Sequence, residues 1–141
     1  MNPIIADRLS ELDALKLDKG SHSSFEDGHC ATELVAYLAG EEHSDEPDCL
    51  SPILGAMLRR FNDNADDELR QRLKPYLPKC IGTANDGKEE LRGYVVSDWS
   101  IRVALPMWME LPGATEVAEK LRALPPLSAE NADVARREAR S

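Results

Sequence analysis

Residues 88–105, KEELRGYVVSDWSIRVAL, decide the fold class because they fit two incompatible periods. Apolar side chains recur at every fourth residue, as one face of a helix requires, at Leu91, Val95, Trp99 and Val103. From Val95 to Leu105, apolar residues also alternate with polar ones, as a half-buried strand requires. Strands usually end within about ten residues, and no partner strand is evident elsewhere in the chain. The stretch therefore predicts a helix, and with it an all-α protein.

Helical spacing continues on both sides of this stretch, in segments bounded by cap residues, glycines or prolines. The further predicted helices cover residues 3–19, 27–39, 52–61, 66–74 and 114–124. The sequence thus predicts a single compact domain of five to six helices over residues 1–127, followed by a flexible charged tail over residues 128–141. The predicted core contains Leu34, Leu38, Leu54, Met57, Leu58, Phe61, Leu73, Val95, Trp99 and Leu121.

The composition fits a chain that folds alone, since 42% of its 141 residues are hydrophobic and 30% are charged. No apolar run approaches the roughly 20 residues that cross a bilayer. The first residues lack the basic start and the apolar stretch of a secretory signal. Three cysteines, an odd number without framework spacing, fit a reducing compartment. We therefore expect a cytoplasmic protein without membrane contact.

The net charge of −9 is unevenly distributed along the chain. No lysine or arginine occurs between Lys19 and Arg59. The same interval holds eight acidic residues, namely Glu26, Asp27, Glu33, Glu41, Glu42, Asp45, Glu46 and Asp48. It also holds all three histidines and two of the three cysteines, at His22, His29, His43, Cys30 and Cys49. The chemistry-bearing residues are therefore concentrated in residues 20–58.

One hypothesis for this region is a structural zinc site. Zinc takes three or four nitrogen, sulfur or oxygen ligands in tetrahedral geometry. We expect His22, Cys30, Glu33 and Cys49 to lie close together, whether or not a metal is bound, because Cys30 and Glu33 stand one helical turn apart. The chain lacks the close ligand pairs of known zinc motifs and the loop pattern of an EF-hand. The alternative is that both cysteines are buried apolar residues and the histidines lie at the surface.

A second hypothesis is a small cysteine- or metal-dependent hydrolase or transferase that uses Cys30 with His22 or His43. A cysteine in the first turn of a helix gains thiolate stability from the unpaired N–H groups there. The many neighbouring acids act in the opposite direction, because negative charge raises the pKa of a thiol. No histidine follows His43 to serve as a distant base.

The third hypothesis, which we favour, is a non-enzymatic interaction or regulatory protein that docks on a basic protein surface. Electrostatic complementarity speeds such encounters, and the acidic chain argues against direct binding of nucleic acid. The alternative is a solvated acidic face that keeps the protein in solution. The expected partner-binding residues are Glu41, Glu42, His43, Asp45, Glu46 and Asp48.

Seven runs of residues carry a resemblance to known proteins, namely residues 20–22, 26–30, 38–45, 47–49, 62–63, 72–75 and 98–99. In these runs the chain resembles a family of small proteins from actinobacteria and their phages. The resemblance extends from about Leu12 to Leu124. It implies a common fold and a bacterial or phage setting, and it assigns no catalytic residue.

Overall fold

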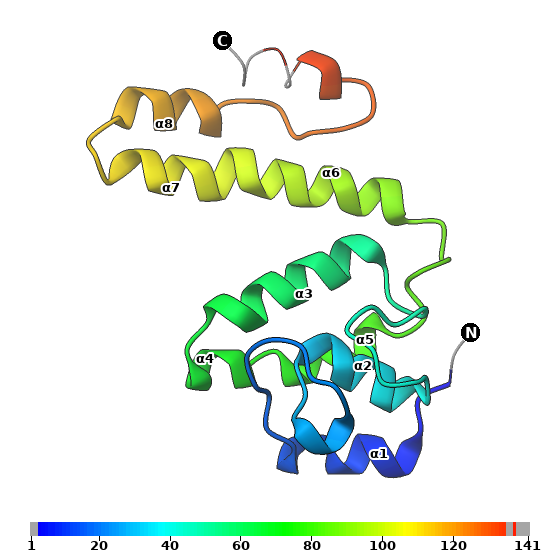
Figure 1. Cartoon of the computed structure of the whole chain (residues 1–141). Coiled ribbons are helices and arrows are strands. Elements are labelled where there is room, and N and C mark those ends of the chain that lie inside the picture. The colour runs from blue at the N-terminus through cyan, green and yellow to red at the C-terminus, as the bar shows by residue number, and fades with distance from the viewer. Residues whose placement is uncertain (1–2, 135–136, 138–141) are drawn as a thin grey trace. The chain divides into compact units, whose positions relative to one another are not determined.

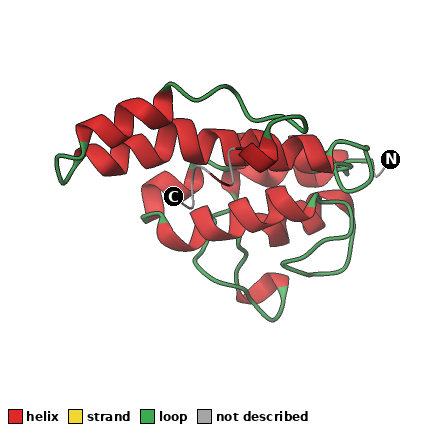
Figure 2. Ribbon diagram, turned by 90° about the horizontal axis from the view of Figure 1, so that it is seen from above, coloured by secondary structure: helices red, strands yellow, loops and turns green. Residues whose placement is uncertain are grey.

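The computed structural model describes residues 3–134 and 137, and the helices in these residues confirm the all-α prediction (Figures 1 and 2). The described residues form no strand, and the nearest approach to a sheet is an isolated antiparallel bridge between Leu50 and Ile81. In the described part of the chain the α-helices run from α1 to α8, slightly more than the predicted five to six. None of the helices in the described residues has the length and apolar character needed to cross a membrane.

The chain divides into two compact units, residues 1–89 (unit 1) and residues 90–141 (unit 2). The predicted single domain over residues 1–127 stays a prediction. The α-helices of unit 1 are α1 (Ala6–Glu11), α2 (Ala31–Ala39), α3 (Pro52–Asn64), α4 (Asp67–Gln71) and α5 (Leu77–Cys80). Its short 3-10 helices are Leu12–Ala14, Phe25–Asp27 and Lys74–Tyr76.

Helix α2 forms the centre of unit 1, since seven of its nine residues are buried. Its side chains Leu34, Val35 and Leu38 are fully buried, and Leu17 and Leu77 pack in the same cluster. The core predictions are confirmed for Leu34, Leu38 and Leu58, whereas Leu54 and Leu73 are partly buried at the edge of the cluster. They are wrong for Met57 and Phe61, which are exposed on α3.

The helix ends in unit 1 follow local capping chemistry. The side chains of Ser51 and Asp66 accept hydrogen bonds from the third residue of α3 and α4, respectively. Gly40 ends α2 in the left-handed conformation, as predicted. Because proline disfavours the helical conformation of the preceding residue, the sequence predicts that Pro75 and Pro78 end helical structure. That prediction is wrong, since each stands at the second position of a further short helix, where no N–H donor is needed.

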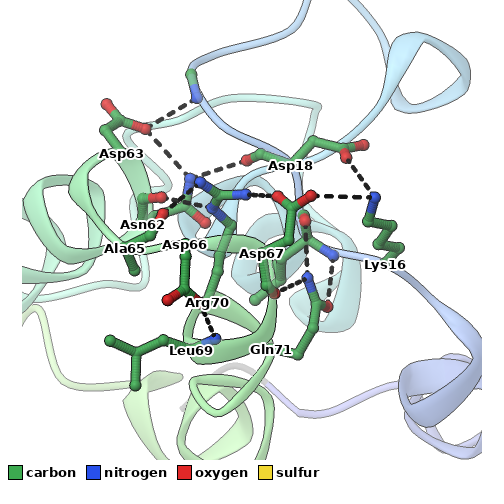
Figure 3. Close-up of polar contacts among 12 residues, drawn as sticks. Lys16, Asp18, Asn62, Asp63, Ala65, Asp66, Asp67, Leu69, Arg70 and Gln71 are labelled. Carbon is green, nitrogen blue, oxygen red and sulfur yellow. Dashed lines mark hydrogen bonds and ion pairs between the residues drawn. The ribbon is translucent and has the colours of Figure 1, made fainter.

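A buried polar network holds the segment before the first histidine against α3 and α4 (Figure 3). Asn62 is fully buried and donates to the carbonyl of Asp18 at 2.9 Å. Gln71 exchanges two hydrogen bonds, both 2.9 Å, with the backbone of Leu17. Asp63 accepts from the N–H of Gly20 at 2.8 Å. These bonds fix the path of residues 17–20, and thereby the position of the residues that follow.

Unit 2 holds nearly all of α6 (Glu89–Trp99), followed by the π-helical turn η4 (Ser100–Ala104), α7 (Leu105–Glu110) and α8 (Thr115–Arg122). This confirms the predicted helix over residues 88–105, except that it starts one residue later, at Glu89 (Figure 1). The sequence predicts that Pro106 kinks or breaks the helix, because a proline conflicts with the carbonyl four residues earlier in a regular α-helix. Here that earlier residue, Arg102, lies within the wider π-turn, and helical structure continues past Pro106.

Helix α8 packs against α7 after a turn at Gly113, whose φ of 87° suits glycine. Asp98 accepts hydrogen bonds from Arg102 and from the backbone N–H of Leu127, and Arg122 pairs with Glu110. Val95 and Trp99, which were predicted to be core residues, are exposed, and Leu121 is half-buried.

The predicted flexible tail over residues 128–141 lies partly outside the described residues. Within residues 128–134, the side chain of Asn131 bonds to the backbone of Pro126 and Ser128, and Ala132 is buried.

Candidate functional site

The candidate site is built around the start of α2, where Cys30 is the N-cap residue and Glu33 is the third helical residue. At this spacing the Glu33 carboxylate folds back and accepts a hydrogen bond from the backbone N–H of Cys30 at 2.8 Å. This is the glutamate half of a capping box. It provides an acceptor for an N–H group that has no partner within the helix. The local sequence therefore directs the Glu33 carboxylate into the protein.

The Glu33 side chain is 1% exposed and collects four polar contacts. Its Oε1 atom accepts from the backbone N–H of His22 at 2.6 Å and lies 3.5 Å from Nε2 of His43. Its Oε2 atom accepts from the N–H of Cys30 and lies 2.9 Å from Nδ1 of His22. A carboxylate offers about four positions for hydrogen-bond donors. The four contacts therefore use all of the acceptor positions of Glu33.

The pKa of Glu33 is lowered by these contacts. Burial acts in the opposite direction and is the largest single influence, because it penalises the charged form. The N–H groups of His22 and Cys30 and the His22 ring together outweigh it. Glu33 is therefore a buried carboxylate that stays ionised at neutral pH.

The His22 ring is held in one orientation. Because Nδ1 faces an ionised carboxylate, Nδ1 carries the proton in the neutral ring, and Nε2 is left as the basic nitrogen. A Cβ atom placed on Gly28 would lie 2.9 Å from Nε2. Gly28 has a φ of 128°, so both the space beside the ring and the backbone conformation require glycine.

His43 ties the following loop to this cluster. Its Nε2 atom lies 2.9 Å from the carbonyl oxygen of His22. We name residues 41–48 the acidic loop. The Glu41 carboxylate closes this loop by accepting from the backbone N–H groups of Asp48 at 2.7 Å and of Cys49 at 2.9 Å.

Arg59 of α3 restrains the middle of the acidic loop. Its Nη1 atom donates to the carbonyl of Asp45 at 2.9 Å, and its Nη2 atom lies 3.9 Å from the carboxylate of Glu46. Gly55, one turn earlier on α3, leaves room for this side chain, because a Cβ there would lie 3.2 Å from Nη1. The loop is thus held at both ends and in its middle.

Two hollows adjoin the acidic loop. A cleft of about 420 Å³ is lined by loop residues Glu46, Pro47 and Asp48 and by residues of α3 and of residues 84–85. A second hollow of about 260 Å³ includes Glu41 and His43 together with an aromatic cluster. In that cluster Phe25 stacks on His29 and Tyr37, and the Arg8 guanidinium lies 4.4 Å from the centre of the Tyr37 ring.

The predicted zinc ligands are brought together only in part. His22, Glu33 and the backbone of Cys30 are in contact. Cys49 bonds to other residues: its N–H binds Glu41 and its carbonyl accepts from Gly82 and Ala84. Among residues 3–134 and 137, no three histidine, cysteine or acidic side chains form a group arranged to hold a metal. The zinc hypothesis stays a prediction, and in this geometry Glu33 orients His22.

The geometry at Cys30 does not favour a nucleophile. Its sulfur is buried and lies 3.3 Å from the hydroxyl of Thr32. Burial raises the pKa of the Cys30 thiol, more than the hydrogen bond from Thr32 lowers it. The pKa of Cys49 is raised to about 11, first by burial and then by the Glu41 carboxylate. Both thiols are therefore protonated at neutral pH.

The six predicted partner-binding residues have different roles in the structure. Glu42, Glu46 and Asp48 are exposed, whereas Glu41, His43 and Asp45 are half-buried. Glu41 and His43 fix the loop through their side chains, and Asp45 does so through its carbonyl. Sequence reasoning missed Arg59 and Gly55, because their roles depend on the path of a loop without periodicity.

Comparisons with protein-family models, curated proteins and solved structures find no match to this chain. The resemblance to actinobacterial and phage proteins therefore stays a prediction.

Proposed function

We propose that the protein is a non-enzymatic binding module whose acidic loop docks a basic segment of a protein partner in the cleft lined by Glu46 and Asp48. The observation that carries this proposal is the restraint of the loop. Glu41, His43 and Arg59 fix its backbone, while Glu42, Glu46 and Asp48 remain exposed. A loop that is ordered before binding loses less conformational entropy on association.

The cleft suits a partner segment that carries both positive charge and apolar surface. Its volume of about 420 Å³ falls in the usual range for ligand sites. Two exposed acidic residues, Glu46 and Asp48, line it, and Leu50, Pro47 and Pro52 give it apolar walls. A lysine or arginine suits such a wall, because its aliphatic stem packs on apolar surface while its head group reaches a carboxylate.

The charge of unit 1 favours a basic partner. Unit 1 has 18 acidic and 10 basic residues, a net charge of −8, whereas unit 2 has 8 and 7, a net charge of −1. Nearly all of the net negative charge of the chain therefore lies on unit 1, which contains the acidic loop. A field of this sign attracts basic segments and repels phosphate backbones.

The test uses short lysine- and arginine-rich peptides as probes, with glutamine-substituted versions as neutral controls. The double variant Glu46→Lys, Asp48→Lys should weaken peptide binding at least about tenfold. A matched variant, Asp13→Lys with Glu68→Lys, makes the same change in net charge at exposed positions outside both hollows and should retain binding. Equal losses in the two variants, or binding that ignores ionic strength, would overturn the proposal.

A further inference from the structure

Within unit 2, most of the large apolar side chains of the described residues are not packed against other elements of the unit. Among its described residues the buried side chains are those of Pro106, Ala118 and Ala132. Isolated helices of this length are marginal in water, and most helical stability comes from packing an apolar face. Its long helix therefore presents a face that is fit for packing against another surface.

Five of the exposed large apolar residues of this helix stand in a regular stripe, whereas Leu105, Trp108 and Leu111 are exposed outside it. Its members, which we name the α6–α7 stripe, are 44% to 60% exposed and stand four residues apart, at Leu91, Val95, Trp99, Val103 and Met107. In a regular α-helix four residues turn about 40° more than one full turn. A row of side chains four residues apart would therefore wind gradually around the helix axis. The π-turn η4 lies within the row, and its wider turn reverses part of that drift. The turn thus keeps the stripe on one side of the helix.

The order of side chains in the stripe indicates what covers it. From Leu91 to Met107 the stripe has the sequence Leu, Val, Trp, Val, Met. The order of side-chain sizes is therefore nearly the same when the stripe is read from either end. A two-fold axis at Trp99 would pair Val95 with Val103 of a second copy and Leu91 with Met107. A two-fold interface is self-complementary in this way, with each contact occurring twice. We propose that the α6–α7 stripe is a homodimer interface in which two copies of this helix pack antiparallel, centred on Trp99.

Charge and area agree with a second copy as the occupant. Unit 2 has a net charge of −1, so two such units approach with little repulsion. The five side chains leave roughly 500 Å² of apolar surface per copy, more than half of the about 800 Å² that a standard interface buries on each side. Tryptophan is also the residue type most enriched among residues that dominate binding.

The first test measures the oligomeric state of the full chain by sedimentation velocity over about two decades of concentration. The chain should form a dimer, and Trp99→Glu should raise the dimer dissociation constant at least about thirtyfold. Val117→Glu, which adds the same charge at an exposed position on α8, should leave it unchanged. Circular dichroism checks that helix content is retained. A chain that stays monomeric, or a dimer unaffected by Trp99→Glu, overturns the proposal.

The second test checks the antiparallel pairing and does not depend on Trp99. Val95→Lys and Val103→Glu should each weaken the dimer, because each places a charge in an apolar contact. The double variant should restore it, since the lysine of one copy then faces the glutamate of the other. These positions are eight residues apart, too far for a pair within one helix. A double variant weaker than both single variants would indicate parallel packing and would overturn the proposal.

Discussion

The Nδ1 atom of His22 lies 2.9 Å from Oε2 of the buried carboxylate of Glu33. The backbone N–H of His22 binds the other oxygen of the same carboxylate. One side chain on α2 therefore fixes both the backbone and the ring of a residue eleven positions earlier. His43 contacts the same pair through Nε2, so the acidic loop depends on this contact as well.

We expect Glu33→Gln to lower the free energy of unfolding by about 2–4 kcal/mol. The amide keeps one acceptor oxygen but turns an NH₂ group toward N–H donors that lie in the protein interior. Urea denaturation followed by circular dichroism measures the loss. The matched control is Glu26→Gln, an exposed glutamate in the preceding 3-10 helix. Similar stability of the two variants would show that the Glu33 contacts contribute little.

Because the pKa of Glu33 is lowered in the folded protein, we expect the free energy of unfolding to depend on pH. The folded-state pKa of Glu33 lies below its ordinary value of 4.5, so the folded protein binds the proton less readily than the unfolded chain. The stabilisation is fully present above pH 4.5 and is lost as the pH falls from there through the folded-state pKa. The free energy of unfolding of the wild type should therefore fall more steeply in this window than that of Glu33→Gln. Parallel pH profiles for the two proteins would contradict the assignment.

The fold could be predicted from the sequence where local chemistry determines it. Ser51, Asp66 and Gly40 mark helix ends as expected, and residues 88–105 are helical. Burial was predicted less well, as the exposed Met57, Phe61, Val95 and Trp99 show. Periodicity indicates which residues share a helix face. It does not indicate whether another element of the same chain covers that face.

The site could be predicted only in part for a similar reason. The proximity of His22, Glu33 and the backbone of Cys30 follows the expectation for residues 20–58. Recognising Cys30 as an N-cap, three residues before a glutamate, would have predicted the direction of the carboxylate. The position of Cys49 could not be predicted, because Glu41 closes the loop through bonds that no helical or strand period describes.

We expect Glu41→Ala to loosen the acidic loop without unfolding unit 1. The backbone N–H groups of Asp48 and Cys49 would both lose their acceptor, and each such bond contributes about 0.5–1.5 kcal/mol. Amide hydrogen exchange measured by NMR should become faster at these two residues. Glu42→Ala, which removes an exposed carboxylate from the adjacent position, is the control and should leave both rates unchanged. Unchanged rates in Glu41→Ala would show that the loop is held by other contacts.

The last prediction concerns the three cysteines, which are all free thiols and all buried. Burial raises the pKa of Cys30, and burial together with the Glu41 carboxylate raises that of Cys49 to about 11, so neither thiol has much thiolate at neutral pH. Since the thiolate is the reactive form, Ellman's reagent should modify the native protein slowly at pH 7 and should titrate three thiols once the protein is unfolded in urea. Mass spectrometry after brief alkylation identifies any thiol that reacts first. Rapid and selective modification of Cys30 in the native protein would contradict the raised pKa, and it would favour the hydrolase or transferase hypothesis over the binding module.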